Sequence, residues 1–333
     1  MRILQIANYT DGVGGIAVQV KLLRDSLVAD GFDCDILSTK GSIPQRIKAV
    51  IQLFTIERHY DVFHIHACSG NGFFPAIAGV LAGRISKKKI VLTYHGGGAE
   101  EFFKKKSSLV KFILNRTNHN IVLSRFIGQV YDKYGIEYTV IPNIVEMDGD
   151  HFRIRNQIYP RFISTRSLTE VYNIRCTIDA FRIVKTRFPE AKLDILGDGP
   201  LRQHLESYVK NNAISGISFI GRVDNSSIYQ YLNEADIMIS SSRFDNMPVS
   251  ILEGFDAGLL VIASNVGGIP FMIKNHENGL LFNPSVPEEL AENAIWAIKH
   301  QQESLDMIKN ARESLELYSW SCIKQLLIPL YNN

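Results

Sequence analysis

The sequence predicts an α/β protein with two doubly wound parallel sheets, and three observations support this. The chain has 333 residues, whereas a single hydrophobic core rarely grows beyond about 250–300 residues. Short, almost unbroken apolar runs alternate with longer helical patterns, as in parallel sheets buried on both faces. This alternation pauses over the polar stretch 146–160 and then resumes. We therefore predict one domain over 1–148, a second over 149–315, and a helix over 316–333 that crosses back to the first domain.

The expected elements follow from where apolar runs and helical patterns begin and end. In the first half, the strands are Arg2–Ala7, Cys34–Ser38, Val62–His66, Ile90–Tyr94, Asn120–Leu123 and Thr139–Ile141, and the helices include Ile16–Ala29, Phe73–Gly83, Glu101–Leu114 and Ser124–Tyr134. In the second half, the strands are Arg161–Ser164, Lys192–Leu196, Ile217–Ile220, Asp236–Ser240 and Leu260–Ala263, and the helices are Thr177–Phe188, Leu201–Asn211, Ser226–Asn233, Val249–Asp256 and Trp320–Tyr331. Such sheets bind ligands at the carboxyl ends of their strands, so two halves imply a site in a cleft between them.

Composition excludes several classes of protein. The net charge of +2 is too small to argue for nucleic acid as a partner. The cysteines are scattered, which argues against a disulfide framework or a zinc site; they are Cys34, Cys68, Cys176 and Cys322. The first apolar run is too short for a signal peptide, and no segment approaches the ~20 apolar residues of a membrane span. We expect a cytoplasmic protein, either free or resting on the inner face of the membrane.

A glycine-rich loop, Asn8–Gly15, follows the first strand. Its Gly12, Gly14 and Gly15 leave room for an anion to approach backbone N–H groups at the start of the next helix. The spacing is not GxGxxG, and no acidic residue ends the second strand, which argues against a nicotinamide dinucleotide. The loop therefore predicts either a phosphate contact or a flexible turn.

A histidine follows the fourth strand within Thr93–Gly98. His95 stands before a run of three glycines at the carboxyl end of a strand. An imidazole there can donate a hydrogen bond to a sugar or phosphate oxygen. An isolated loop histidine is more often packed or solvated, but this position favours a role in binding.

The segment Ser240–Gly258 runs from a strand end through a loop into a helix. Asp245 and Asn246 are typical of a helix N-terminus, and Pro248 suits a first helical position. The segment therefore predicts a helix N-terminus at the binding edge of the second sheet.

Polar groups at this helix start suit a sugar nucleotide. The N–H groups of Val249 and Ser250 would point toward a phosphate. Glu253, one turn further in, can bind a diol, and Asp245 can accept from sugar hydroxyls. Either acid alone would more often be a helix cap or a buried or surface carboxylate.

Taken in order, these segments resemble the family-four group of retaining glycosyltransferases, which have the GT-B fold of two Rossmann-like domains. The resemblance covers nearly the whole chain. Asp245–Glu253 occupies the place of the family's paired-acid motif, two glutamates eight positions apart. Further matching motifs are Ile141-Pro142-Asn143, Leu196-Gly197-Asp198-Gly199-Pro200, Phe219-Ile220-Gly221-Arg222-Val223 and Val266-Gly267-Gly268-Ile269-Pro270.

The resemblance implies transfer of a hexose from a nucleoside-diphosphate sugar to a hydroxyl of a glycan or lipid-linked acceptor, in polysaccharide or glycoconjugate synthesis. It implies retention at the anomeric carbon by front-face attack, without a metal or cofactor. It also implies a role for each matched residue: Gly14 and Gly15 approach the diphosphate or sugar, His95 contacts the transferred sugar, Arg166 neutralises the diphosphate, backbone at Arg222 and Val223 meets the base, Asp245, Asn246 and Met247 hold sugar hydroxyls, and Glu253 holds the ribose.

Three departures from the family pattern bear on these roles. Asp245 is shorter than the usual glutamate, and Pro248 lacks an N–H that the family often uses. The family's lysine shortly after Arg166 is absent; Val171-Tyr172-Asn173 stands there, and Arg175 and Lys185 are the alternative cations. A departing diphosphate needs such stabilisation. Two alternatives therefore stay open: a non-hydrolysing sugar-nucleotide epimerase and a degenerate, non-catalytic sugar-nucleotide-binding module.

Two metal-like motifs carry less weight. Asp33-Cys34-Asp35 resembles a metal-binding DxD, but it precedes its strand, at the end remote from the binding edge. His64 and His66 lie on one face of a strand without a third ligand at convincing spacing, which favours a buried or acceptor-site role.

Two basic segments in the first domain suggest a peripheral membrane contact. They are Lys87–Lys89 and Phe102–Lys106. Lysines next to phenylalanines can rest on an anionic bilayer. A solvated helix face with two core aromatics is the equally weighted alternative.

Overall fold

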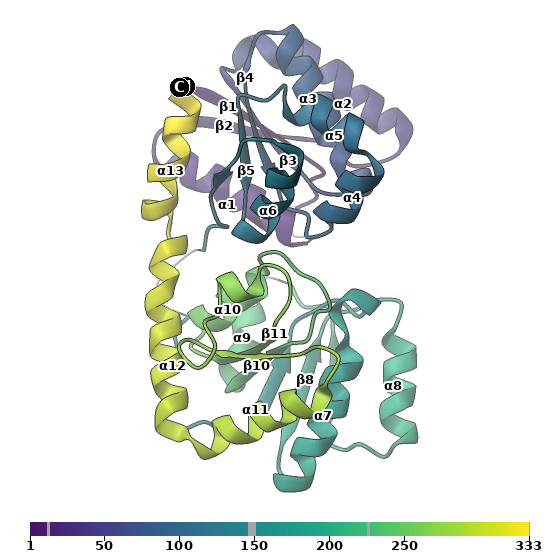
Figure 1. Cartoon of the computed structure of the whole chain (residues 1–333), viewed down its shortest axis with the longest axis vertical. Coiled ribbons are helices and arrows are strands. Elements are labelled where there is room, and N and C mark those ends of the chain that lie inside the picture. The colour runs from purple at the N-terminus through teal and green to yellow at the C-terminus, as the bar shows by residue number, and fades with distance from the viewer. Residues whose placement is uncertain (12–13, 146–150, 225–226, 333) are drawn as a thin grey trace. The chain divides into compact units, whose positions relative to one another are not determined.

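The computed structural model describes residues 1–11, 14–145, 151–224 and 227–332, without the side chain of Glu57 (Figure 1). The chain forms two compact units. The first comprises Met1–Glu146 and Tyr318–Asn333, and the second comprises Met147–Leu317. The boundary predicted between 148 and 149, together with Gly12 and the predicted helix start at Ser226, lies outside the described residues.

The first unit contains a six-stranded parallel sheet in the order β2-β1-β3-β4-β5-β6. Its strands are β1 (Arg2–Ala7), β2 (Asp33–Ser38), β3 (Val62–Ala67), β4 (Lys89–Tyr94), β5 (His119–Val122) and β6 (Thr139–Val140). Its helices are α1 (Gly15–Ala29), α2 (Ile43–Ile56), α3 (Phe74–Ile85), α4 (Ala99–Lys105), α5 (Ser107–Leu114), α6 (Arg125–Tyr134) and α13 (Trp320–Asn332). Helices α2 to α6 build the core on one face, whereas α1 and α13 build the core on the other.

The second unit contains a six-stranded parallel sheet in the order β12-β11-β10-β7-β8-β9. Its strands are β7 (Arg161–Ser164), β8 (Lys192–Leu196), β9 (Ile217–Gly221), β10 (Ile237–Ser240), β11 (Leu260–Ser264) and β12 (Leu280–Phe282). Its helices are α7 (Ile174–Arg187), α8 (Arg202–Asn211), α9 (Ile228–Glu234), α10 (Val249–Asp256), α11 (Pro287–Lys299) and α12 (Gln301–Ser314). The predicted parallel α/β fold is confirmed in both units.

The predicted strands are present to within one residue at each end, but three details differ. Strand β12 was not predicted. The helix expected over Glu101–Leu114 is two helices, α4 and α5, because the backbone at Lys106 leaves the helical region with φ −129°. Pro248 is the N-cap of α10 with extended ψ, so it precedes the first helical position that we predicted for it.

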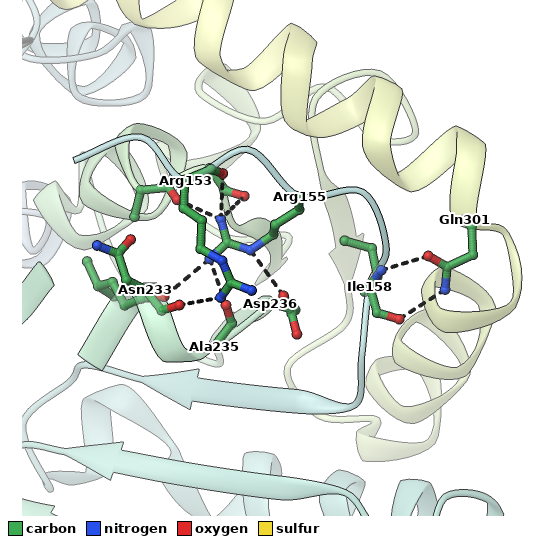
Figure 2. Close-up of polar contacts among 10 residues, drawn as sticks. Arg153, Arg155, Ile158, Asn233, Ala235, Asp236 and Gln301 are labelled. Atoms are coloured by element: carbon green, nitrogen blue, oxygen red, sulfur yellow. Dashed lines mark hydrogen bonds and ion pairs between the residues drawn. The ribbon is translucent and has the colours of Figure 1, made fainter. Parts of the chain in front are cut away.

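The segment that enters the second unit is fastened by a buried arginine (Figure 2). Arg155 Nε donates to Asp236 Oδ1 at 3.2 Å, and neither side chain is exposed. Its other nitrogens donate to backbone oxygens of Arg153, Ala257, Gly258, Leu232 and Ala235. Burial lowers the pKa of Arg155 to about 10, so the guanidinium stays charged. Further along the segment, the Gln301 side chain exchanges hydrogen bonds with the Ile158 backbone.

Helix α13 completes the first unit. Its Ile323, Leu327 and Tyr331 are buried in the same core as residues of α1 and the sheet. Leading into it, the Val145 N–H donates to the Tyr318 carbonyl at 2.9 Å. The last helix of the chain is therefore part of the first unit's core.

Candidate functional site

Strands β7 and β10 lie side by side in the second sheet. From β7 the chain continues to β8 on one side, and from β10 it continues to β11 on the other. This is the topological switch point of a doubly wound sheet, where ligands bind at the carboxyl ends of the strands. Arg166 follows β7, and the Asp245–Ser250 segment follows β10. The fold thus brings several of the predicted site residues to one place in the second unit.

Arg166 is the centre of this group. Its Nη2 forms an ion pair with Asp245, and its Nη1 donates to Ser250 Oγ at 3.0 Å. The guanidinium also lies over the Tyr172 ring, 4.1 Å from its centroid. Its buried Nε has no hydrogen-bond partner among the described residues. These contacts fix a planar cation with one donor still to be satisfied, which suits an anionic ligand.

The helix start supplies backbone donors beside this cation. Helix α10 begins at Val249, so the N–H groups of Val249 and Ser250 have no acceptor within the helix. Just before it, the Asn246 N–H donates to Asp245 Oδ1 at 2.9 Å. Asn246 and Met247 are themselves buried, so few of their atoms are accessible to a ligand. The positive end of the helix dipole favours an anion here.

Glu253 lies one turn into α10 and is half-buried. Burial raises the pKa of its carboxyl group to about 7, while Arg166 opposes this rise and Asp256 adds to it. The group therefore changes its protonation state near neutral pH. A perturbed carboxyl beside a fixed cation is typical of a functional site.

Two glycines let neighbouring loops approach the Arg166–Asp245 pair closely. Gly197 has φ +132°, and a Cβ there would come within 2.3 Å of the Arg166 carbonyl oxygen. Gly267 has φ +56°, and a Cβ there would come within 1.9 Å of the Asp245 carbonyl oxygen. Only glycine fits either position. The glycine motifs after β8 and β11 thus support the two loops that carry the pair.

Arg222 and Val223 follow β9 at the same edge of the sheet. Arg222 is exposed and Val223 is half-buried. Strand β8 separates β9 from β7, and among the described residues no hydrogen bond or ion pair joins Arg222 or Val223 to Arg166. They share the edge without joining the Arg166 group.

The two alternative cations for the missing lysine are engaged elsewhere. Arg175 pairs with Asp179 on α7, and Lys185 donates to the Ala191 carbonyl at 2.8 Å. Arg243 is the cation that sequence reasoning missed. Its N–H donates to the Val171 carbonyl at 2.8 Å, and its Nη2 donates to Asn173 Oδ1 at 3.2 Å. Its position two residues before Asp245 was the sequence feature that could have identified it.

In the first unit, Gly14 caps α1 with φ +87°, a conformation that favours glycine. Helix α1 begins at Gly15, and both residues are exposed. These two residues therefore present a helix N-terminus at the carboxyl end of β1, as expected for a phosphate-binding loop.

Three histidines form a chain beneath the His95 loop. His66 Nδ1 lies 2.9 Å from His95 Nε2, and the His64 and His66 rings stack with centroids 4.4 Å apart. His64 is bonded to Tyr331 of α13 at 2.6 Å and to Thr93 at 2.8 Å. Both strand histidines are buried, which was one of the two roles expected for them, and their hydrogen bonds fix their orientation.

Burial lowers the pKa of His95 to about 4 and that of His64 to about 3. His64 and His95 are therefore neutral at pH 7. His66 Nε2 is buried without a hydrogen-bond partner among the described residues. An unmet acceptor costs less than an unmet N–H, which favours His66 Nδ1–H donating to His95. His95 then carries its proton on Nδ1 and can donate to a ligand.

The remaining motifs are placed as follows. Asp33 and Asp35 both lie within β2, at its amino end, rather than before the strand as we predicted. The part of the chain that the structure describes contains no group of three or more His, Cys, Asp or Glu side chains able to hold a metal ion. Nor does any helix in it have the length and apolar character needed to cross a bilayer.

The aromatic pair expected at a membrane belongs to the core. Phe103 is fully buried, and Phe102 packs against the same cluster. Phe103 also contacts the rings of Tyr94 and Tyr131. The Phe102–Lys106 segment therefore has Phe103 in the core and Phe102 only partly exposed, which agrees with the alternative of a solvated helix face with core aromatics.

Both halves of the chain match models of glycosyltransferase families. Residues 151–314 match the model described as glycosyl transferases group 1. Residues 42–148 match the model described as glycosyltransferase family 4. The two matches together include Arg166, Glu253 and His95.

Curated relatives match about half of the chain. A sulfoquinovosyl transferase of Arabidopsis thaliana is 28% identical over 148 residues, which cover 43% of this chain and 28% of that protein. The N-acetyl-alpha-D-glucosaminyl L-malate synthase of Bacillus anthracis is 29% identical over 154 residues, covering 46% and 40%. The alpha-monoglucosyldiacylglycerol synthase of Acholeplasma laidlawii is 24% identical over 220 residues, covering 58% and 54%.

Solved structures match the fold over the whole chain. The sucrose-phosphate synthase of Thermosynechococcus elongatus superposes with a TM-score of 0.83 at 17% identity, covering 100% of this chain and 98% of that one. The Anabaena protein HepE in complex with UDP-glucose superposes with a TM-score of 0.80 at 17% identity, covering 100% and 99%. The chain belongs to the group 1 glycosyltransferases and has their GT-B fold.

Proposed function

We propose that this chain is a retaining hexosyltransferase that moves a sugar from a nucleoside diphosphate to a hydroxyl group. The single observation that carries the proposal is the Arg166 group in the second unit. A fixed cation, the free N–H groups at the start of α10 and a perturbed carboxyl meet at the switch point. These groups suit a diphosphate leaving group, because charge develops on it as the glycosidic bond breaks.

In this proposal, Arg166 and the N–H groups of Val249 and Ser250 hold the diphosphate, and Glu253 holds the ribose. Asp245 is shared between Arg166 and the sugar hydroxyls. His95 donates from Nδ1 to an oxygen of the sugar. The leaving phosphate oxygen takes the acceptor's proton as the new bond forms on the same face, so the anomeric configuration is kept. No residue is needed as a covalent nucleophile.

The donor and acceptor are proposed from the relatives. Structures of similar fold contain UDP or UDP-glucose, so uridine diphosphate sugars are the first donors to test. Relatives are named for the synthesis of a glycosyl diacylglycerol and of amylovoran. We therefore propose a glycan or lipid-linked hydroxyl as the acceptor and polysaccharide or glycolipid synthesis as the role.

A thermal-shift screen with uridine, guanosine and adenosine diphosphate glucose tests donor binding. With the donor that binds, Glu253→Ala and His95→Ala should each lower transfer by about 100-fold while each variant keeps a cooperative melting transition. Glu292→Ala and His204→Ala, at exposed positions on α11 and α8, are matched controls that should retain transfer.

Three outcomes would contradict the proposal. Near-normal turnover in both site variants would remove the site assignment. Epimerisation of the donor without an acceptor would identify an isomerase. Donor binding without turnover over a broad acceptor panel would identify a binding module. An NMR spectrum of the product's anomeric proton tests retention.

A further inference from the structure

Helix α2 carries an apolar stripe that no part of the described chain covers. Ile43, Ile47, Ile51 and Phe54 are 75%, 54%, 61% and 42% exposed. Their spacing of four, four and three residues places them on one face of the helix. At 3.6 residues per turn, this face lies roughly 130° around the helix from the buried Ala49 and Leu53. The stripe is thus distinct from the face that packs on the protein.

Two neighbouring helices also carry exposed apolar residues. Helix α3 packs against α2, and α5 packs against α3 (Figure 1). Leu81 and Ile85 of α3 and Leu109 and Phe112 of α5 are exposed as well. Single exposed apolar residues are normal, but a group of them on adjacent helices marks an interaction surface. We call this surface the α2–α3–α5 face.

The helices of the α2–α3–α5 face carry positive charge and no acid, and the first acid along the chain after α2 is Glu57. The three helices contain no Asp or Glu; their charged residues are Arg46, Lys48, Arg84 and Lys111. Lys87–Lys89 follow α3, and Arg116 follows α5, with its guanidinium 3.6 Å from the centroid of the Phe112 ring. Apolar side chains are therefore bordered by cations alone on these helices.

We propose that the α2–α3–α5 face docks onto an anionic lipid surface, with α2 lying in the plane of the interface. An exposed apolar stripe bordered by basic residues is the pattern of an interfacial helix, in which apolar side chains enter the lipid and cations meet headgroups. A second copy of the chain fits less well, because a two-fold interface would oppose the same cations. An acidic protein partner would meet the charge but needs a matching apolar surface.

This docking surface differs in part from the membrane contact predicted from the sequence. Lys87–Lys89 follow α3 of this face, whereas Phe103 is a core residue and Phe102 packs against the core. The proposal does not rest on sugar transfer, because the α2–α3–α5 face includes none of the residues assigned to catalysis. Its test accordingly reads binding alone and needs no donor or acceptor.

The test compares sedimentation of the full chain with vesicles of phosphatidylcholine alone and with vesicles that also contain phosphatidylglycerol. The full chain should bind the anionic vesicles and lose most of this binding in high salt. Ile47→Ser/Ile51→Ser should lower the partition coefficient at least about tenfold. Ile154→Ser/Leu317→Ser, which changes two apolar residues of the second unit that are even more exposed than Ile47 and Ile51, should leave it unchanged. Melting curves establish that each variant is folded.

A tryptophan probe tests the orientation. With brominated lipids in the anionic vesicles, Ile51→Trp should show fluorescence quenching beyond that of the wild type, and Ile154→Trp should not. Unchanged binding by the Ile47/Ile51 variant, or equal quenching at the two positions, would overturn the proposal. Absence of vesicle binding would also overturn the proposal. This holds even if the chain self-associates or captures an acidic protein through this face.

Discussion

At the scale of single residues, Glu253 couples the stability of the second unit to pH. Its carboxyl has a pKa of about 7 in the folded chain against an ordinary value of 4.5. Between these values the folded state holds a proton that the unfolded state has lost. The contribution of Glu253 to the free energy of unfolding is therefore at its maximum below about pH 4.5 and is lost as the pH rises through 7.

Glu253→Gln, which stays neutral, should remove this loss. We expect the variant to exceed the wild type in free energy of unfolding at pH 8 by on the order of 2 kcal/mol, and to match it near pH 4. Urea denaturation at the two pH values measures this difference. Glu292→Gln, at an exposed position of α11, is the control and should show no such dependence. An equal effect of the two substitutions would show that the burial of Glu253 does not act in this way.

The residues of the site were predictable by type and position, but their partners were not. Sequence motifs identified Arg166 and Asp245, which lie 79 positions apart. Nothing along the chain indicates that they pair, because their contact arises only when β7 and β10 become neighbours. The same holds for His66 and His95, 29 positions apart on adjacent strands. Arg243 was missed because its partners come from a different loop.

At the scale of elements, Arg155 joins the entry segment of the second unit to β10 and α10. It contacts the side chain of Asp236 and the carbonyls that end α9 and α10. Asp236 is fully buried. Among the described side chains, Arg155 is the only cation within ion-pair distance of the Asp236 carboxylate.

Arg155→Met should lower the free energy of unfolding by about 3–5 kcal/mol, because it leaves a buried carboxylate without its partner. Arg155→Met/Asp236→Asn should recover part of the loss. Arg161→Met, at an exposed position that starts β7, should cost less than about 0.5 kcal/mol. Chemical denaturation measures all three. A small effect of Arg155→Met would mean that the entry segment is held by Gln301 and packing instead.

Most elements were predictable from their patterns, but one short strand and one helix break were not. The apolar runs of β1, β3 and β11 gave their bounds to within one residue. Strand β12 has only three residues, too few to establish a period. The break at Lys106 was hidden because the residues on both sides favour helix.

At the scale of the whole molecule, the two units differ in how their cores are assembled. The second unit is continuous in sequence, whereas the first takes α13 from the far end of the chain. Residues 151–317 alone should therefore fold and bind the donor nucleotide, with a cooperative melting transition.

Residues 1–145 alone should not fold stably, because the core formed with Ile323, Leu327 and Tyr331 would be exposed. Joining residues 318–332 to them through a flexible linker should restore a cooperative transition, which circular dichroism can follow. A stable 1–145 fragment would show that α13 adds little to the first unit.

The contribution of α13 also sets an order of events during synthesis. A ribosome releases the amino-terminal part of a chain first, and domains usually fold in that order. Here the earliest residues must wait for the last ones, so the second unit can reach its native state while the first is still incomplete. Nascent chains of this protein would then expose the unfinished core, including the surface that Tyr331 later covers, until α13 has been synthesised and has packed.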